Sequence, residues 1–143
     1  MSRIRPIAIC VIQKDASLFL MECHDSVKKE TYYRPLGGGI EFGERGEAAV
    51  RREFKEEIGA ELKNLSFLAS IENLYTLEGK PGHEIVLVFK ADFIDPSFYE
   101  VPERPIIENG VPCDKAVWKP FKLFQEGKAP LYPEDLLGLL AGK

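Results

Sequence analysis

Three glutamates have a spacing that could create a metal site: Glu56 and Glu57 lie three and four positions after Glu53 in this 143-residue chain. On an α-helix this spacing places the three carboxylates on one face, where they can converge. Like charges arranged in this way repel each other unless a cation neutralises them. Because carboxylate oxygens suit Mg²⁺ or Mn²⁺ better than Zn²⁺, the spacing predicts a divalent-metal site on a helix.

The same segment carries a stripe of apolar side chains. Val50, Phe54 and Ile58 recur every four residues, which predicts that one helical face packs on the core while the glutamates face outward. Gly59 is typical of the left-handed residue that ends a helix. These residues together predict a short amphipathic helix with an acidic outer face.

Three glycines precede this helix and one arginine lies within it. Gly37, Gly38 and Gly39 have no β-carbon, so their backbone can approach a ligand and offer a carbonyl to a metal or amides to a phosphate. Arg52 can reach Glu56 one helical turn further on. We expect this arginine to contribute to catalysis mainly by orienting the carboxylates.

A longer pattern surrounds these residues. Between positions 38 and 60 the chain reads GGIEFGERGEAAVRREFKEEIGA, which resembles the signature of the Nudix hydrolases, G-x(5)-E-x(7)-R-E-U-x-E-E-x-G-U, where U is a bulky apolar residue. The invariant positions are filled by Gly38, Glu44, Arg52, Glu53, Glu56, Glu57 and Gly59. A pattern of this length is far more specific than a lone glycine motif.

The departures from this signature are mild. Phe54 stands where an aliphatic residue is usual, and Ala60 is smaller than the expected last residue. The family usually has proline directly before the glycines, whereas here Leu36 takes that place and Pro35 lies one residue earlier. These changes can alter the approach of the glycine segment, but they remove none of the expected ligands.

The composition is that of an ordinary globular protein. The length predicts one domain, residues 1–143, and 45% hydrophobic with 29% charged residues is typical of a soluble chain. No apolar run could cross a membrane and no signal peptide is evident, so we expect a cytoplasmic protein without a membrane partner. A net charge of −4 disfavours a nucleic-acid polymer as partner. Small anionic substrates remain compatible, with charge supplied by metal ions and by Arg34, or by Lys28 and Lys29 if these do not simply lie in a solvated loop.

The cysteines suggest no covalent framework. Cys10, Cys23 and Cys113 are odd in number and widely spaced, and no pair has the C-x-x-C spacing. This pattern indicates neither a disulfide scaffold nor a zinc site. We therefore expect three reduced thiols with mostly structural roles.

Apolar and β-branched runs predict strands on both sides of the helix. The predicted strands cover residues 4–12, 18–21, 62–75, 84–93 and 115–118, and further helices are expected at 121–125 and 133–140. Between them we expect a turn at 14–17, a polar stretch at 22–31, a turn-rich connection at 78–83 and an irregular segment at 94–111. The order of elements indicates an α/β fold with a mixed sheet and helices on both faces. The resemblance implies a Nudix-type α/β/α sandwich over most of the chain.

The resemblance also implies an activity. Nudix hydrolases cleave a nucleoside diphosphate linked to another moiety, with water attacking phosphorus. Pyrophosphate repels nucleophiles, so metal ions must screen its charge, polarise a phosphoryl oxygen and acidify the water, and Mg²⁺ or Mn²⁺ is the implied cofactor. The implied metal ligands are Glu53, Glu56, Glu57, a carbonyl of Gly38 or Gly37, and Glu44 as a further carboxylate or a brace for the loop.

The general base stays open among three glutamates. Glu56 and Glu57 are candidates within the signature, and Glu84 is a candidate outside it. Glu84 precedes an apolar strand and fits an exposed strand end equally well. His83 is expected to be a turn residue rather than a catalyst.

The substrate also stays open, because the signature contacts only the pyrophosphate that all family substrates share. Candidates are ordinary or oxidised nucleoside triphosphates, ADP-ribose or other nucleotide sugars, and dinucleoside polyphosphates. The residues expected to contact substrate are Arg34, Gly37, Gly39 and Tyr75, of which Tyr75 could stack on a base or pack in the core. A catalytically silent Nudix-fold domain that senses nucleotides or binds a partner is the alternative, although the complete set of glutamates favours an enzyme. A homodimer is an expectation from the family alone.

Overall fold

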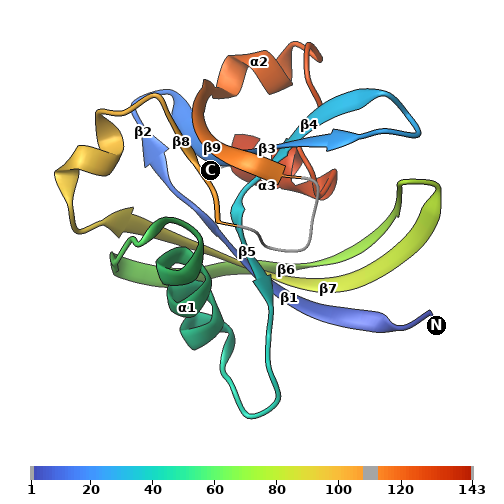
Figure 1. Ribbon diagram of the computed structural model, residues 1–143, viewed down its shortest axis with the longest axis horizontal. Helices are drawn as coiled ribbons and strands as arrows, with labels where there is room; N and C mark the ends of the chain where they lie inside the picture. The colour runs from blue at the N-terminus through green and yellow to red at the C-terminus, as the bar shows by residue number, and fades with distance from the viewer. Residues whose placement is uncertain (1, 108–112, 143) are drawn as a thin grey trace.

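The computed structural model describes residues 2–107 and 113–142, whose strands form two sheets (Figure 1). The first sheet has the order β5 (Leu36–Gly39), β1 (Ile4–Val11), β7 (Lys80–Phe93) and β6 (Leu62–Leu77). Strands β1 and β7 run parallel, whereas the other two pairs are antiparallel. This sheet is therefore mixed, as the sequence predicts.

The second sheet is antiparallel throughout. Its longest strand, β3 (Ser17–Asp25), pairs with β2 (Gln13–Lys14), β4 (Glu30–Arg34) and β9 (Cys113–Pro120). Strand β8 (Glu103–Pro105) pairs with the far side of β9. The division of the strands into two sheets was not part of the prediction, because it depends on pairings between segments that are far apart in the chain.

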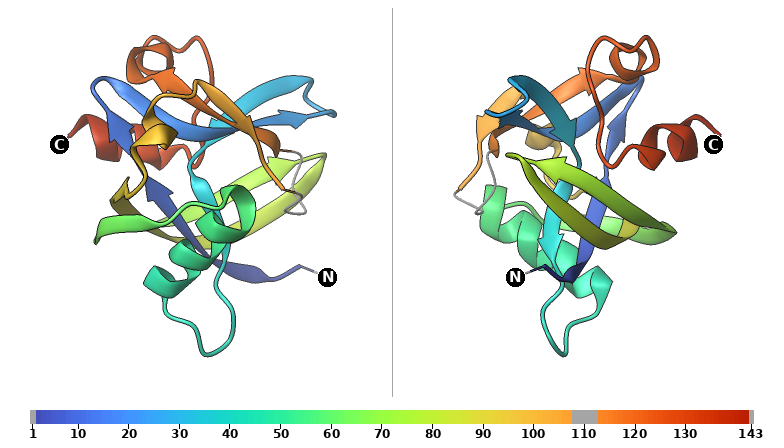
Figure 2. Two further views of the ribbon diagram at one scale, coloured as in Figure 1. Left: turned by 60° about the vertical axis from the view of Figure 1, so that its left-hand side comes forward. Right: turned by 90° about the vertical axis from the view of Figure 1, so that its right-hand side faces the viewer.

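Helices cover different sides of this arrangement. Helix α1 (Gly46–Ile58) contacts β1 and β5, whereas α3 (Asp135–Ala141) contacts β6 on another side of the molecule (Figure 2). A buried cluster lies beneath α1, and a second lies between the sheets and includes residues of α2 (Phe121–Gln125) and α3. The mixed α/β class is thereby confirmed. No helix within the described residues is long and apolar enough to cross a membrane.

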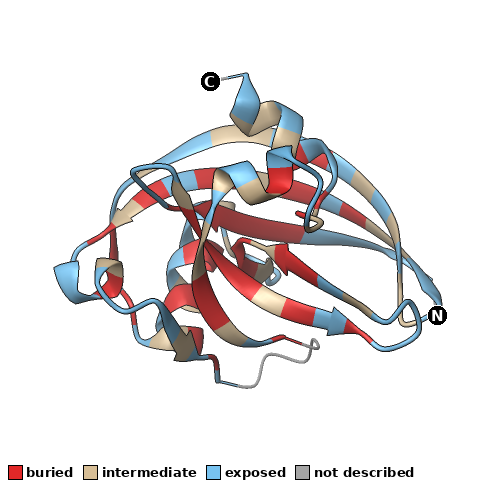
Figure 3. Ribbon diagram, turned by 90° about the horizontal axis from the view of Figure 1, so that it is seen from above, coloured by how far each residue is buried: buried red, intermediate tan, exposed pale blue. Residues whose placement is uncertain are grey.

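Helix α1 has the predicted orientation. Val50 and Phe54 are fully buried, and Ile58 packs against the same cluster. Gly59 adopts a left-handed φ of 70°, and its N–H donates to the carbonyl oxygen of Lys55 at 3.0 Å, which ends the helix as expected. The apolar stripe therefore fixes α1 on the first sheet. Buried residues follow the strands through the middle of the molecule, while the outer turns are exposed (Figure 3).

Two segments predicted as polar connections are largely strand. The stretch 22–31 contains the end of β3, where Cys23 and Asp25 are buried and His24 is exposed, followed by a short turn and the start of β4. The connection predicted at 78–83 consists only of Glu78 and Gly79, both with positive φ, between β6 and β7. Successive side chains of a strand point to opposite faces, so a strand with one exposed face can carry many charged residues. The polar composition of these segments therefore suggested loops although they form strands.

Other boundaries shift by a few residues. The segment predicted as irregular contains the 3₁₀-helix η1 (Pro96–Tyr99) and β8, and its last part, 108–111, lies outside the described residues. Strand β9 is longer than predicted, and the last helix begins at Asp135 rather than at position 133. The glycines at 37–39 belong to β5, where hydrogen bonds to β1 replace the expected flexible loop.

Cys23 and Cys113 form a disulfide, which corrects the prediction of three reduced thiols. The two residues lie opposite each other in β3 and β9, with their Cα atoms 4.0 Å apart. Strand pairing thus brings together two cysteines that are separated by 90 positions in the sequence. Cys10 keeps a free thiol, and burial raises the pKa of that thiol.

Loss of the disulfide is expected to lower the free energy of unfolding by about 2–4 kcal/mol, because the bond closes a long loop in the unfolded chain. Urea unfolding of Cys113→Ser and of the wild-type protein under oxidising conditions measures this difference. In dithiothreitol the two proteins should become nearly equal in stability. A difference of the same size in reductant would assign the effect to the packing of the thiol instead.

Candidate active site

The three glutamates of α1 lie in different environments. Glu53 packs against Gly38, since a β-carbon added to this glycine would lie 2.8 Å from the Glu53 carboxylate. Glu56 is exposed, whereas Glu57 is buried, with 3% of its surface accessible. The segment after β8 contacts the helix at this point, where the N–H of Ile107 donates to the carbonyl oxygen of Glu57 at 3.1 Å. The expected outward acidic face is therefore wrong for Glu57.

Arg52 connects the acidic residues to the glycine strand. Its guanidinium donates to both carboxylate oxygens of Glu44, at 2.8 and 2.9 Å. It also donates to Glu53 at 2.8 Å and to Glu56 at 3.1 Å. A further bond of 2.9 Å reaches the carbonyl oxygen of Gly39 in β5. The planar, multiply donating guanidinium thus holds three carboxylates and one strand in a fixed arrangement.

These contacts change the electrostatics of Glu44. Hydrogen bonds from Arg52, followed by one from the backbone N–H of Glu41, lower the pKa of Glu44 from 4.5 to about 2. The same carboxylates raise the pKa of Arg52. Glu44 and Arg52 therefore stay charged throughout the neutral range and brace the turn before α1.

Oxygen donors for a divalent cation are present, but they are not gathered into a ready-made cage. Within residues 2–107 and 113–142, no three acidic, histidine or cysteine side chains come together closely enough to hold an ion. Glu53 and Glu56 instead share the Nη1 atom of Arg52 as their hydrogen-bond donor. The donor chemistry, carboxylates beside a glycine strand with carbonyl oxygens, nevertheless fits Mg²⁺ or Mn²⁺.

The glycines of β5 are required by close packing. Gly37 has a φ of 147°, and a β-carbon there would lie 2.1 Å from the carbonyl oxygen of Ala8 in β1. Gly38 leaves room for a glutamate carboxylate, as described above. Gly39 lies beside these two on the wall of a small cavity of about 80 Å³ that Glu53 also lines. The glycines thus let the helix, β5 and β1 approach one another.

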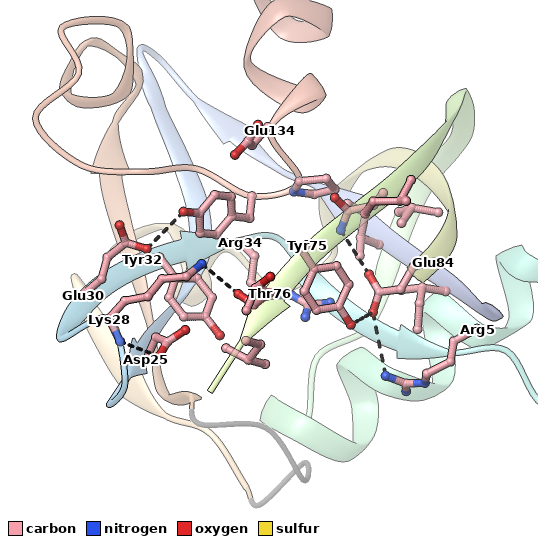
Figure 4. Close-up of a pocket in the computed structure, with 18 residues that line it drawn as sticks. Arg5, Asp25, Lys28, Glu30, Tyr32, Arg34, Tyr75, Thr76, Glu84 and Glu134 are labelled. Carbon is pink, nitrogen blue, oxygen red and sulfur yellow. Dashed lines mark hydrogen bonds and ion pairs between the residues drawn. The ribbon is translucent and has the colours of Figure 1, made fainter. Parts of the chain in front are cut away.

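Glu84 is buried, with 5% of its surface accessible, so the interpretation as an exposed strand end is wrong (Figure 4). It accepts hydrogen bonds from Tyr75 Oη at 3.0 Å and from Asn73 Nδ2 at 3.3 Å, and Arg5 lies 3.7 Å away. Burial, and then the charge of Glu84, raise the pKa of Tyr75. His83 lies within β7 rather than in a turn. The neighbouring Glu84 carboxylate is thus held in place inside the protein by Tyr75 and Asn73.

A cavity of about 120 Å³ lies next to Glu84, between the two sheets (Figure 4). Tyr32, Tyr75 and Tyr132 provide aromatic surface. Its other polar and charged lining residues are Arg5, Asp25, Lys28, Glu30, Arg34, Asn73, Thr76, Glu84 and Glu134. Tyr75 and Arg34, which the sequence predicts as substrate contacts, therefore line this cavity, and Lys28 lines it from an exposed turn.

The two cavities share walls. Arg5, Ile7, Arg34 and Glu84 line both the cavity between the sheets and the small cavity beside Glu53. These residues come from β1, β4 and β7, which meet between the sheets. A path of charged groups therefore joins the acidic face of α1 to the aromatic cavity.

Sequence reasoning missed several lining residues. Arg5 was not among the predicted site residues. It lies two positions before Ile7, on the same face of a strand whose other side chains are apolar. Its relevance depends on the parallel register of β1 and β7, which places Arg5 opposite Glu84. Tyr132 is a similar case, since its Oη donates to Glu30 at 3.0 Å across a long sequence separation. The available signals were the charge of Arg5 within an apolar strand and the aromatic ring of Tyr132, whereas the partners of both residues depend on the fold.

The turns of the β3–β4 and β6–β7 hairpins contact each other at the outer end of the cavity. The N–H and hydroxyl groups of Ser26 both donate to the Glu78 carboxylate, and Lys28 Nζ donates to the carbonyl oxygen of Thr76 at 2.7 Å. Asp25 accepts from the backbone N–H of Lys28 at 3.0 Å and of Glu78 at 3.1 Å. We call this set of five residues the hairpin clasp.

The clasp should weaken in acid. The hydrogen bond from the Lys28 N–H, followed by those from Glu78 and Val27, lowers the pKa of Asp25 below its ordinary 3.8. A lowered folded-state pKa means that ionised Asp25 stabilises the fold above about pH 4, and that this contribution is lost as pH falls through the folded-state pKa. The difference in unfolding free energy between wild type and Asp25→Asn should therefore narrow below pH 4. Urea unfolding at several pH values measures this gap, and a constant gap would contradict the assignment.

A family model for the NUDIX domain matches residues 3–134. The chain therefore belongs to the Nudix family. Membership supports hydrolysis of a pyrophosphate-type bond as the general class of activity, and the residues of the family signature are those that surround Arg52.

Solved structures with a similar fold include three bacterial proteins. A NUDIX hydrolase from Nitrosomonas europaea has a TM-score of 0.69 at 16% identity, over 97% of this chain and 87% of that one. A mutator MutT protein from Bacillus halodurans has a TM-score of 0.64 at 20% identity, over 94% and 79% of the two chains. The ORF135 protein of E. coli has a TM-score of 0.57 at 19% identity, over 98% and 88%. At these identities the likeness concerns the fold alone.

Proposed function

We propose that this chain, acting as one domain, is a metal-dependent hydrolase of a nucleoside diphosphate linked to another moiety. The observation that carries the proposal is a pair of adjoining cavities with Arg5 and Arg34 in their shared walls, one lined also by Glu53 and the other by three tyrosines. An acidic end suits metal ions, a cationic passage suits phosphates, and an aromatic cavity suits a base or sugar ring. The three parts match the three chemical portions of such a substrate.

The metal ligands in this proposal are the carboxylates of Glu53, Glu56 and Glu57, with Glu44 and the Gly38 carbonyl as further donors. Bound Mg²⁺ or Mn²⁺ would screen the pyrophosphate charge and acidify the attacking water. Glu53 already lies against Gly38, and Glu57 is held within the protein, so two donors have limited freedom. Arg52 donates to the carboxylates of both Glu53 and Glu56, and its role is to position them.

The chain's own cations bind the phosphates in this proposal. Arg34 and Arg5 line both cavities, and each can neutralise a phosphate that extends from α1 toward the space between the sheets. Gly37 and Gly39 line the inner cavity and leave space for the same phosphates. Tyr75, fixed by its bond to Glu84, offers a ring for the terminal moiety.

The water's proton is taken by Glu56, Glu57 or Glu84. Glu56 is exposed and can turn toward a water, whereas Glu84 is held by Tyr75 and Asn73. Replacement of each glutamate by glutamine, followed by the pH dependence of kcat/KM, separates them. Only removal of the base should abolish the acid limb of the profile.

The test of the function is a phosphate-release screen with and without Mg²⁺. The panel comprises nucleoside triphosphates, ADP-ribose, other nucleotide sugars and dinucleoside polyphosphates, with phosphatase or pyrophosphatase as coupling enzymes. Turnover of one class that requires the metal supports the proposal and names the substrate. Nucleotide binding detected by thermal shift without turnover of any compound would instead favour a catalytically silent sensing domain.

A further inference from the structure

The hairpin clasp lies at the opposite end of the cavity from the signature glutamates. In the first sheet, Ala8 of β1 pairs with Gly38, beside Glu53, and with Leu87 of β7. Strand β7 then runs back past Glu84 to its turn with β6. The residues that line the cavity follow this direction, from Glu84 to Lys28 and Thr76 at the two hairpin turns (Figure 4).

The clasp forms a wall rather than a loose contact. Lys28 bridges the hairpins through its bond to Thr76, and both residues line the cavity. Asp25 also lines it and is 1% exposed, with its carboxylate accepting backbone N–H groups from both hairpins. Several charge-assisted bonds therefore have to break together before the outer end can open.

The space beside the clasp is small and partly open to solvent. Its volume of about 120 Å³ compares with the roughly 150 Å³ of an engineered protein cavity that admits one benzene molecule. A cavity of this size holds a single ring, and any substituent on the far side of that ring meets the clasp.

We propose that the hairpin clasp sets substrate specificity by limiting the length of the group that enters the cavity between the sheets. The class selected is a pyrophosphate compound whose distal moiety ends in a compact ring, and compounds extended beyond this ring are rejected. The inference rests on the proposed function, since it assigns the ring of the same substrate to this cavity.

Ser26 and Glu78 make the test possible, because they join the two hairpin turns by hydrogen bonds to each other and do not line the cavity. Glu78→Ala removes both bonds to Ser26 and leaves every lining side chain in place. Ser26→Ala is a milder second variant that loses only the hydroxyl bond. Glu72→Ala is the matched control, since Glu72 is an exposed glutamate of β6, the strand that precedes Glu78, and does not line the cavity.

The probes are the four ordinary nucleoside triphosphates and their counterparts with an aminohexyl linker on the base. The wild-type protein and Glu72→Ala should have a kcat/KM at least about tenfold lower for the linker compound, as expected for a cavity of fixed length. In Glu78→Ala the ratio of kcat/KM for the ordinary compound to kcat/KM for the linker compound should fall at least about threefold, through a lower KM for the linker compound. The kcat for the ordinary compound should change less than about twofold. Ser26→Ala should shift the ratio in the same direction by a smaller factor.

An unchanged ratio in both clasp variants would overturn the proposal, as would a fall in kcat for ordinary and linker compounds alike. Melting-temperature shifts with the same compounds provide a second readout that requires no turnover. If no compound is hydrolysed but the linker compound stabilises only the clasp variants, the clasp assignment stands and the proposed hydrolysis fails. If neither compound shifts the melting temperature of any variant and none is hydrolysed, the cavity does not hold a nucleotide ring and the clasp assignment fails as well.

Discussion

Replacement of Glu57 by glutamine is expected to lower turnover of the preferred substrate by about 100-fold or more. The change replaces a buried carboxylate of α1 by an amide of nearly the same volume, so the fold should persist without this proposed metal ligand. Steady-state kinetics at saturating Mg²⁺ measure the loss. Thermal unfolding adds a readout independent of activity, because a cation that binds the folded state raises the melting temperature. The variant should show a smaller Mg²⁺-dependent rise than the wild-type protein.

Glu47→Gln is the control for this prediction. Glu47 lies in the first turn of the same helix, is exposed, and contacts Arg51 rather than the signature residues. The control should keep both turnover and the response of its melting temperature to Mg²⁺. Unaltered turnover in Glu57→Gln would remove Glu57 from the metal site and leave Glu53 and Glu56 as the carboxylates to test.

Phe54→Ala is expected to lower the free energy of unfolding by about 3–5 kcal/mol, because the substitution leaves a cavity beneath α1. The ring is fully buried and lies 6.2 Å from the ring of Phe93, measured between centroids. It belongs to the cluster that holds α1 on the first sheet. Urea unfolding followed by circular dichroism measures the change.

Phe42→Ala provides the comparison within the same family signature. Phe42 is fully exposed in the turn before α1, so its truncation should change stability by no more than about 0.5 kcal/mol. Equal stability of wild type and Phe54→Ala would mean that α1 presents a different face to the sheet. A large loss in Phe42→Ala would mean that its ring is buried by a contact absent from the isolated chain.

The features predicted well from sequence are those fixed by local spacing. The four-residue recurrence of Val50, Phe54 and Ile58 predicted the buried face of α1, and Gly59 predicted its end, because both depend only on helix geometry. The spacing of one helical turn likewise predicted the contact of Arg52 with Glu56, whereas its contact with Glu44 was not predicted. The α/β class followed from the order of these elements.

The features that were missed depend on which strands pair. Cys23 meets Cys113 only because β3 pairs with β9, and Arg5 meets Glu84 only because β1 and β7 run parallel in one particular register. Neither register leaves a mark in local composition. The burial of Glu57 was missed for the same reason, since Ile107, which contacts it, comes from a distant part of the chain.

Strand β1 cannot be changed to alter one part of the protein alone, because its two faces pack in two different buried clusters. Its alternate side chains serve both cores: Ile7 and Ile9 pack between the sheets and line the cavity, while Ala8 and Cys10 pack beneath α1. A slip of one residue would exchange the two sets and disrupt the lining of the cavity and helix docking together. Redesign of the cavity should therefore leave this strand intact and begin at the hairpin turns, whose residues 26–29 and 78–79 belong to neither buried cluster.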